Sequence, residues 1–269
     1  MLQSGDKTFL VDAGRGATLR LRQSDVQLTE LDAVFLTHLH FDHISDLGDV
    51  IMGAWNLGRT DDLTVVGPPG LGPIVECLLG SVYAIDIEYR IREAALQGQV
   101  LRNPSEMVHV RTATEGTVWR DEEVSVSAGE VDHGDILEIP GWMAVGYRFE
   151  DATGAITVSG DSVPCPRLFE LAQDTDVLIQ CCYLSHDELS NDATRWLSRH
   201  VLGGADEAVE IARKSGVGKL VLSHLRQKSA SELTELAHYV GSRVPCPVLV
   251  GEDLMVIDSG PASRSGPVR

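Results

Sequence analysis

The chain has 269 residues, which suits one large domain or two small ones and allows a substantial core. Hydrophobic residues make up 43% of it, but no stretch approaches the roughly 20 apolar residues of a membrane helix. The formal net charge of −18 disfavours nucleic acid as a partner, because phosphate contacts normally depend on clustered Lys and Arg.

The opening residues and the cysteines both indicate a reducing compartment. The first 14 residues lack a basic segment followed by an apolar run, so no secretory signal is indicated and we expect a cytoplasmic protein. Five cysteines form neither a disulfide framework nor a CxxC zinc site, because their number is odd and their spacing irregular. They are Cys77, Cys165, Cys181, Cys182 and Cys246.

The first part of the chain predicts alternating strands and helices. An apolar strand at 8–12 is followed by two glycines and a helix to about residue 24. A buried strand at 32–37 runs directly into a histidine-rich segment. A further strand at 63–66 is stopped by the turn sequence GPPG, and a helix is expected at 71–79.

The rest of the chain begins β-rich and then alternates again, which is typical of a layered α/β protein. The turn at 151–154 predicts a hairpin between two strands. Strands are expected at 108–110, 117–120, 124–128, 143–149, 155–158, 177–180, 219–223, 248–250 and 255–257, and helices at 164–172, 204–215 and 229–240. The composition of 259–269 predicts a disordered tail.

Residues 37–43, with the sequence THLHFDH, carry the sharpest chemical signal. Imidazole nitrogens and carboxylate oxygens are the ligands that zinc takes in catalytic sites. Residues two apart on a strand share a face, so His38 and His40 can point the same way. A turn after them would redirect Asp42 and His43, and one segment could then supply ligands to two neighbouring ions.

Three distant residues occur in the same context, directly after an apolar strand. They are His133 in VDH, Asp161 in VSGD and His224 in LSH. Ligands at strand ends along one edge of a sheet converge, so we expect these residues to complete the metal site.

At these residues the sequence resembles the metallo-β-lactamase superfamily, in its ribonuclease Z-like and arylsulfatase-like branch. The matching motifs are TFLVDAGRG, FLTHLHFDHISDL, VDH with VGYRFE, TVSGDS and KLVLSHL, in that order. The resemblance implies a single domain at 1–258, with the four-layer αβ/βα sandwich of that fold and the metals at one edge.

The resemblance also implies the roles of the ligands. His38, His40 and His133 would bind one metal, Asp42, His43 and His224 would bind the other, and Asp161 would bridge both. A hydroxide between the metals would be the nucleophile, with Asp42 orienting or deprotonating the water. Two zinc ions suit these ligands, and manganese or iron could occupy the same positions.

Several features depart from ribonuclease Z. Only 27 residues separate His133 from Asp161, too few for the tRNA-gripping arm. In ribonuclease Z a glutamate orients the general-acid histidine, and Cys181 stands at the corresponding position here. Neither Cys181 nor Cys182 is expected to bind metal. His200 is retained without its usual neighbours, so it is either the general acid or a surface residue; His186 is a further candidate for the same cleft. The glycine-rich opening strand of that branch is missing before Leu2, so either the start is misassigned or the first strand is trimmed.

Three functions remain open at this stage. The first is hydrolysis of a small ester, with a phosphodiester favoured over a sulfate ester, carboxyl ester or lactone. The second is tRNA 3′-processing endoribonuclease activity, which the short span and the acidic charge disfavour. The third is a non-catalytic metal-binding regulatory protein of the same fold. A homodimer is compatible with all three.

Overall fold

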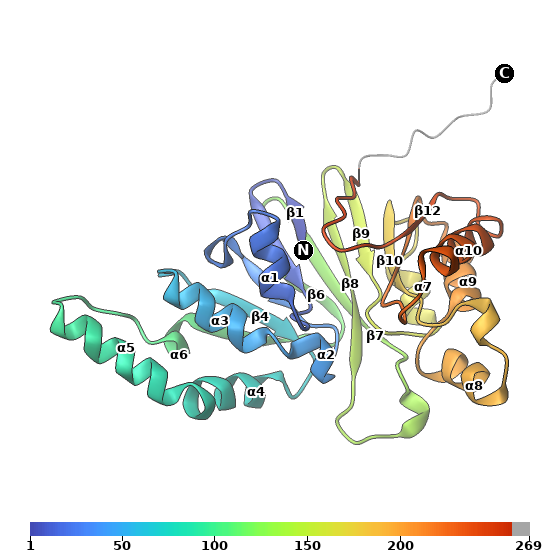
Figure 1. The fold of residues 1–269 in the computed structure, drawn as a ribbon. Helices are drawn as coiled ribbons and strands as arrows, with labels where there is room; N and C mark the ends of the chain where they lie inside the picture. Colours follow the sequence, from blue (N-terminus) through green and yellow to red (C-terminus); the bar gives the residue numbers. More distant parts are fainter. Residues whose placement is uncertain (260–269) are drawn as a thin grey trace. The chain divides into compact units, whose positions relative to one another are not determined.

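Two mixed sheets organise the residues that the computed structural model describes, 1–259. Each sheet belongs to its own unit of the chain, Met1–Ala113 for the first and Thr114 onward for the second (Figure 1). Almost all of the predicted disordered tail, from residue 260, lies outside the described residues. Within residues 1–259, no helix combines the length and apolar character needed to cross a bilayer.

The first sheet has the order β1-β2-β3-β4-β5. Its strands are β1 (Leu2–Ser4), β2 (Lys7–Val11), β3 (Ala33–Phe35), β4 (Leu63–Gly67) and β5 (Val108–Thr112). Only β1 and β2 pair antiparallel; the other neighbours are parallel. The carboxyl ends of β2, β3 and β4 therefore share one edge of the sheet.

Helices cover one face of this first sheet. They are α1 (Ala17–Gln23), α2 (Phe41–Ile44), α3 (Leu47–Asn56), α4 (Leu71–Cys77), α5 (Ala84–Leu96) and α6 (Pro104–Met107), with a 3-10 turn at Leu28–Glu30 and a π-helical turn at Leu78–Val82. Leu21 of α1, Ile51 of α3 and Val75 of α4 share one hydrophobic core with Val34 and Val65 of the strands. Helix packing of this kind leaves the loops at the strand ends for function.

The second sheet has the order β12-β11-β10-β9-β8-β7-β6. Its strands are β6 (Gly116–Arg120), β7 (Ser125–Val131), β8 (Ala144–Asp151), β9 (Gly154–Val158), β10 (Val177–Cys181), β11 (Leu220–Ser223) and β12 (Val248–Val250). Pairing is antiparallel from β6 to β9 and parallel from β9 to β12. Strands β7, β9, β10 and β11 consequently end at the same edge.

The described part of the second unit, residues 114–259, contains the helices α7 (Pro166–Leu171), α8 (Asp192–His200), α9 (Ala205–Ser215) and α10 (Ala230–Gly241), with 3-10 turns at Asp135–Leu137 and His186–Glu188. Leu168 of α7, Ile211 of α9 and Val240 of α10 pack in one core with Leu178 and Leu222 of the strands. Ser229 begins α10 with a capping box, accepting a hydrogen bond from the backbone of Glu232.

Most elements predicted from the sequence are present, and the 151–154 turn does join β8 to β9. The α/β class is confirmed, and each unit consists of a mixed sheet with helices on it. The strand predicted at 255–257 is wrong, because these residues have no strand partner. Helices α3, α5, α6 and α8 were not predicted, and the turn expected after His40 is the short helix α2.

Candidate metal centre

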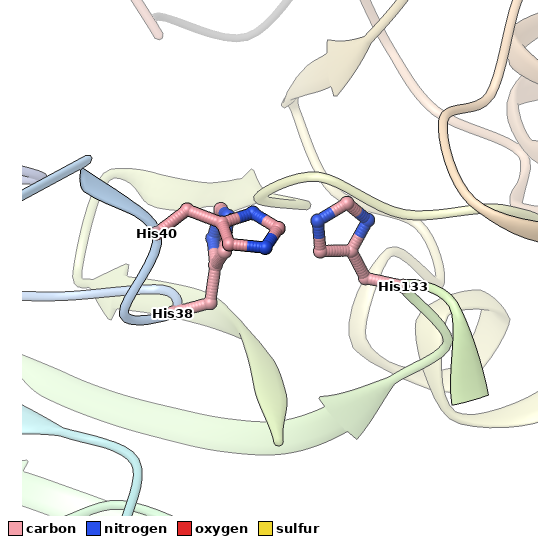
Figure 2. Close-up of side chains that lie close together, drawn as sticks. All are labelled: His38, His40 and His133. Carbon is pink, nitrogen blue, oxygen red and sulfur yellow. The ribbon is translucent and has the colours of Figure 1, made fainter. Parts of the chain in front are cut away.

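His38 and His40 leave the end of β3 with their rings side by side. His38 Nε2 lies 3.0 Å from His40 Nδ1, and the ring centroids are 4.7 Å apart. Figure 2 shows these two rings and also labels His133, which follows β7 in the second unit. His38 is fully buried, whereas His40 is exposed. The two rings lie together as expected, but not through strand geometry, because β3 ends at Phe35 and residues 36–40 are not in a strand.

Asp12, at the end of β2, fixes the orientation of His43. Asp12 Oδ2 accepts a hydrogen bond from His43 Nδ1 at 2.8 Å, and Asp12 Oδ1 accepts one from the backbone N–H of Thr37 at 2.7 Å. The Thr37 hydroxyl lies 2.9 Å from Asp12 Oδ2 and 3.0 Å from His38 Nδ1. Both histidines thus use Nδ1 for protein contacts, which leaves Nε2 for a metal.

Asp42 and His43 lie in α2, the single helical turn after His40. Asp42 Oδ2 is 3.9 Å from His43 Nε2. Gly14 runs so close to this turn that an added Cβ would clash with the carbonyl oxygen of Asp42, and only glycine fits there. The backbone N–H of Ala13 also bonds to the His43 carbonyl at 2.8 Å, which ties the turn to β2.

In the second unit, Asp161 lies between two histidines. Its Oδ2 atom is 3.3 Å from His224 Nε2 and 4.0 Å from His133 Nε2. These residues follow β9, β11 and β7, whose ends share one edge of the sheet. His224 adopts a φ of 53°, a left-handed conformation that is uncommon outside glycine and concentrates at functional sites.

His200 is connected to this group through the backbone. His133 Nδ1 donates a hydrogen bond to the carbonyl of Val201 at 2.6 Å, so the end of α8 is attached to His133. His200 is half-buried, and its ring centroid is 5.3 Å from that of Trp196. His186 belongs to a different cluster, in which its Nδ1 atom is 2.9 Å from the Tyr239 hydroxyl.

Cys181 lies closer to the metal-type ligands than the sequence indicated. Its thiol, Asp161 and His224 each offer a ligand atom within 4.8 Å of the others. Burial, and then the charge of Asp161, raise the pKa of the Cys181 thiol well above its usual range. This side chain consequently fills space beside Asp161 as a neutral group.

These donors fit divalent metal ions. Two atoms bound at about 2.1 Å to one tetrahedral ion lie about 3.4 Å apart. The His38–His40 and Asp161–His224 spacings, 3.0 Å and 3.3 Å, are close to this value. His43 Nδ1 contacts the Asp12 carboxylate, and His133 Nδ1 contacts the Val201 carbonyl. Metal-binding histidines typically have a carboxylate or a backbone carbonyl at the second ring nitrogen.

Residues 7–225 match the family described as "Beta-lactamase superfamily domain", well over half of the chain. The chain belongs to this superfamily. Similar proteins include the ribonuclease Z of Mycobacterium sp. strain KMS, 32% identical over 97% of this chain and 89% of that protein. The ribonuclease Z of Mycobacterium marinum is 34% identical over 83% of this chain and 78% of that protein.

Solved structures agree on the fold. Human tRNase Z, short form, matches with a TM-score of 0.66 at 19% identity, covering 96% of this chain and 90% of that one. The metallo-β-lactamase fold protein YhfI from Bacillus subtilis also gives 0.66, at 22% identity over 93% and 86%. The expected metallo-β-lactamase fold is therefore confirmed, and the family match together with the ribonuclease Z relatives confirms the expected hydrolase class.

Every ligand predicted from the sequence lies after the end of a strand or in the short helix that follows one. The first unit holds His38, His40, Asp42 and His43, and the second holds His133, Asp161, His224 and His200. Sequence reasoning did not assign the orienting roles of Asp12 and Val201. For Asp12 a signal was present, since it ends the apolar strand of the TFLVD motif.

Proposed function

We propose that the two ligand sets together bind two divalent metal ions. The ligands are His38, His40, Asp42, His43, His133, Asp161 and His224. Support comes from their pairing: each set offers partners for two ions, and the Oδ2 atom of Asp161 lies near one histidine of each proposed ion. Zinc suits this mixture of imidazole and carboxylate, and manganese or iron would accept the same donors.

The chemistry follows from these residues. Bound metal ions would acidify water and stabilise charge on the oxygens of a phosphodiester. Asp42, exposed at the start of α2, orients the attacking water and accepts its proton. His200 donates a proton to the leaving oxygen, because α8 ends beside the backbone contact to His133. Asp12 and the Val201 carbonyl keep His43 and His133 in the tautomer whose Nε2 atom can bind metal.

We propose an RNA phosphodiester as the substrate, in the manner of ribonuclease Z. The observation that supports this most strongly is the similarity to proteins of that name over nearly the whole chain. The sequence analysis favoured a small ester because of the net charge and the short span between motifs. We now favour RNA, because the similarity to a ribonuclease Z extends over 97% of the chain.

One structural feature keeps a small phosphodiester as the second candidate. Strands β8 and β9 are joined by a two-residue turn, so the span from His133 to Asp161 carries no inserted arm. The net charge of −18 also opposes extended contacts to a phosphate backbone. A small substrate would need neither an arm nor a basic surface.

A side-by-side assay separates the candidates. Metal-loaded protein is given a tRNA precursor with a 3′ trailer and bis(p-nitrophenyl) phosphate, with Asp42→Asn as the inactive control. Cleavage at the tRNA 3′ junction with kcat/KM above about 10⁴ M⁻¹s⁻¹ supports the ribonuclease proposal. Efficient turnover of the small diester alone supports the second candidate. Full metal loading without turnover of either favours a non-catalytic role.

A further inference from the structure

An exposed apolar loop follows the metal-type ligand His133 directly. We call residues 134–142, which connect β7 to β8, the lip. Ile136, Leu137 and Ile139 are each more than half exposed. Consecutive large apolar side chains in solvent are unfavourable unless something covers them, and such patches mark binding sites.

The lip is held in place by contacts to His133. The Trp142 indole donates a hydrogen bond to the His133 carbonyl at 2.8 Å, and the two rings lie 5.6 Å apart. At the other end, a Cβ added to Gly134 would lie 3.4 Å from Leu137 and 3.8 Å from Val201. Leu137 therefore lies over the residue that follows His133, beside the end of α8.

The charge of the lip indicates which part of a substrate it can contact. Its sequence, GDILEIPGW, contains two acidic residues, Asp135 and Glu138, and no Lys or Arg. Carboxylates would repel a phosphate, so the phosphate must be bound elsewhere, as the proposed metal ions would do. The exposed aliphatic side chains favour an uncharged, apolar group, and in a nucleotide or an aryl ester that group is a planar ring.

We propose that the lip binds the planar aromatic group next to the scissile phosphate, which is either a nucleobase carried on the ribose or an aryl group bonded to a phosphate oxygen. The proposal rests on the phosphodiesterase function above and names the part of the substrate that it recognises. Leu137 is the central contact, because it is the exposed apolar side chain of the lip that lies beside Gly134, the residue after His133. Ile136 and Ile139 extend the surface on either side of it in sequence.

Ligand binding tests this without relying on turnover. Isothermal titration of metal-loaded protein compares phenyl phosphate with methyl phosphate, and adenosine 5′-monophosphate with ribose 5-phosphate. Both members of a pair carry one phosphate, but only one member carries a planar ring. The wild type should bind the aromatic member of a pair at least about tenfold more tightly, the scale of small apolar contacts in binding sites. The preferred pair identifies an aryl group or a nucleobase.

Leu137→Ser should reduce this preference about fivefold or more while leaving the Kd of methyl phosphate unchanged. Leu254→Ser, at a leucine of similar exposure after β12, is the matched control and should change neither value. An unchanged preference in Leu137→Ser, or equal binding of both members by the wild type, overturns the proposal. If the protein hydrolyses no diester but still binds the aromatic member of a pair more tightly, the proposed role of the lip stands and the phosphodiesterase function is rejected.

Discussion

Replacing Asp12 with Asn should weaken one metal position by changing the tautomer of His43. The Asp12 carboxylate accepts from three donors: the Thr37 backbone N–H at Oδ1, His43 Nδ1 at Oδ2, and the Thr37 hydroxyl, which lies near both oxygens. Asparagine keeps one oxygen, which the Thr37 backbone N–H requires. Its amide NH₂ then faces His43 Nδ1 and donates to it. The proton of His43 moves to Nε2, the atom that would otherwise bind the metal.

The expected loss is about 10- to 100-fold in affinity for one ion, which is typical when the carboxylate behind a metal-binding histidine is removed. At about 1.4 kcal/mol per tenfold, this corresponds to about 1.4 to 2.8 kcal/mol. The ion proposed at His38 and His40 should retain its affinity more closely, because the Thr37 hydroxyl remains beside His38 Nδ1.

Competition with a chromophoric chelator measures both affinities, and the absorption spectrum of the cobalt-substituted protein reports the ligand geometry. Asp46→Asn is the matched control, since Asp46 accepts the backbone N–H groups of Gly16 and Thr18 in the same unit. Equal losses in both variants would mean that general loosening of the loops is responsible. An Asp12→Asn protein with two ions at wild-type affinity would refute the tautomer argument.

Four further predictions follow from individual side chains. Asp42→Ala should lower turnover about 10³-fold in a steady-state assay, since it removes the group that positions water. His200→Ala should slow RNA cleavage much more than that of an aryl phosphodiester, whose leaving group needs little protonation; equal losses would argue against a general acid. Leu178→Ala, in a fully buried position, should cost about 2–5 kcal/mol in denaturant unfolding. Burial raises the pKa of the Cys182 thiol to about 12, above its ordinary value of 9.0, so the free energy of unfolding measured against pH should hold below 9 and fall toward 12.

Local patterns accounted for most of the elements. Short apolar runs bounded by glycine or proline predicted strands such as β4, and the Asp151 turn predicted the β8–β9 hairpin. Helix α5 was not predicted because its apolar residues lie on two faces. Ile87 is buried while Ile85 and Tyr89 are exposed, so the sequence lacks a clear helical period of apolar residues. The wrong strand at 255–257 had strand composition but finds no neighbour to pair with.

The sequence by itself determined the donor chemistry of this protein. Imidazoles and carboxylates at strand ends are visible as short motifs, because the strand and its following ligand are adjacent in the chain. Only the tertiary structure decided what holds those ligands. Asp12 meets His43 across 31 positions, and the Val201 carbonyl meets His133 across 68. Such contacts depend on which strands become neighbours in a sheet, a property of long-range packing that no local pattern encodes.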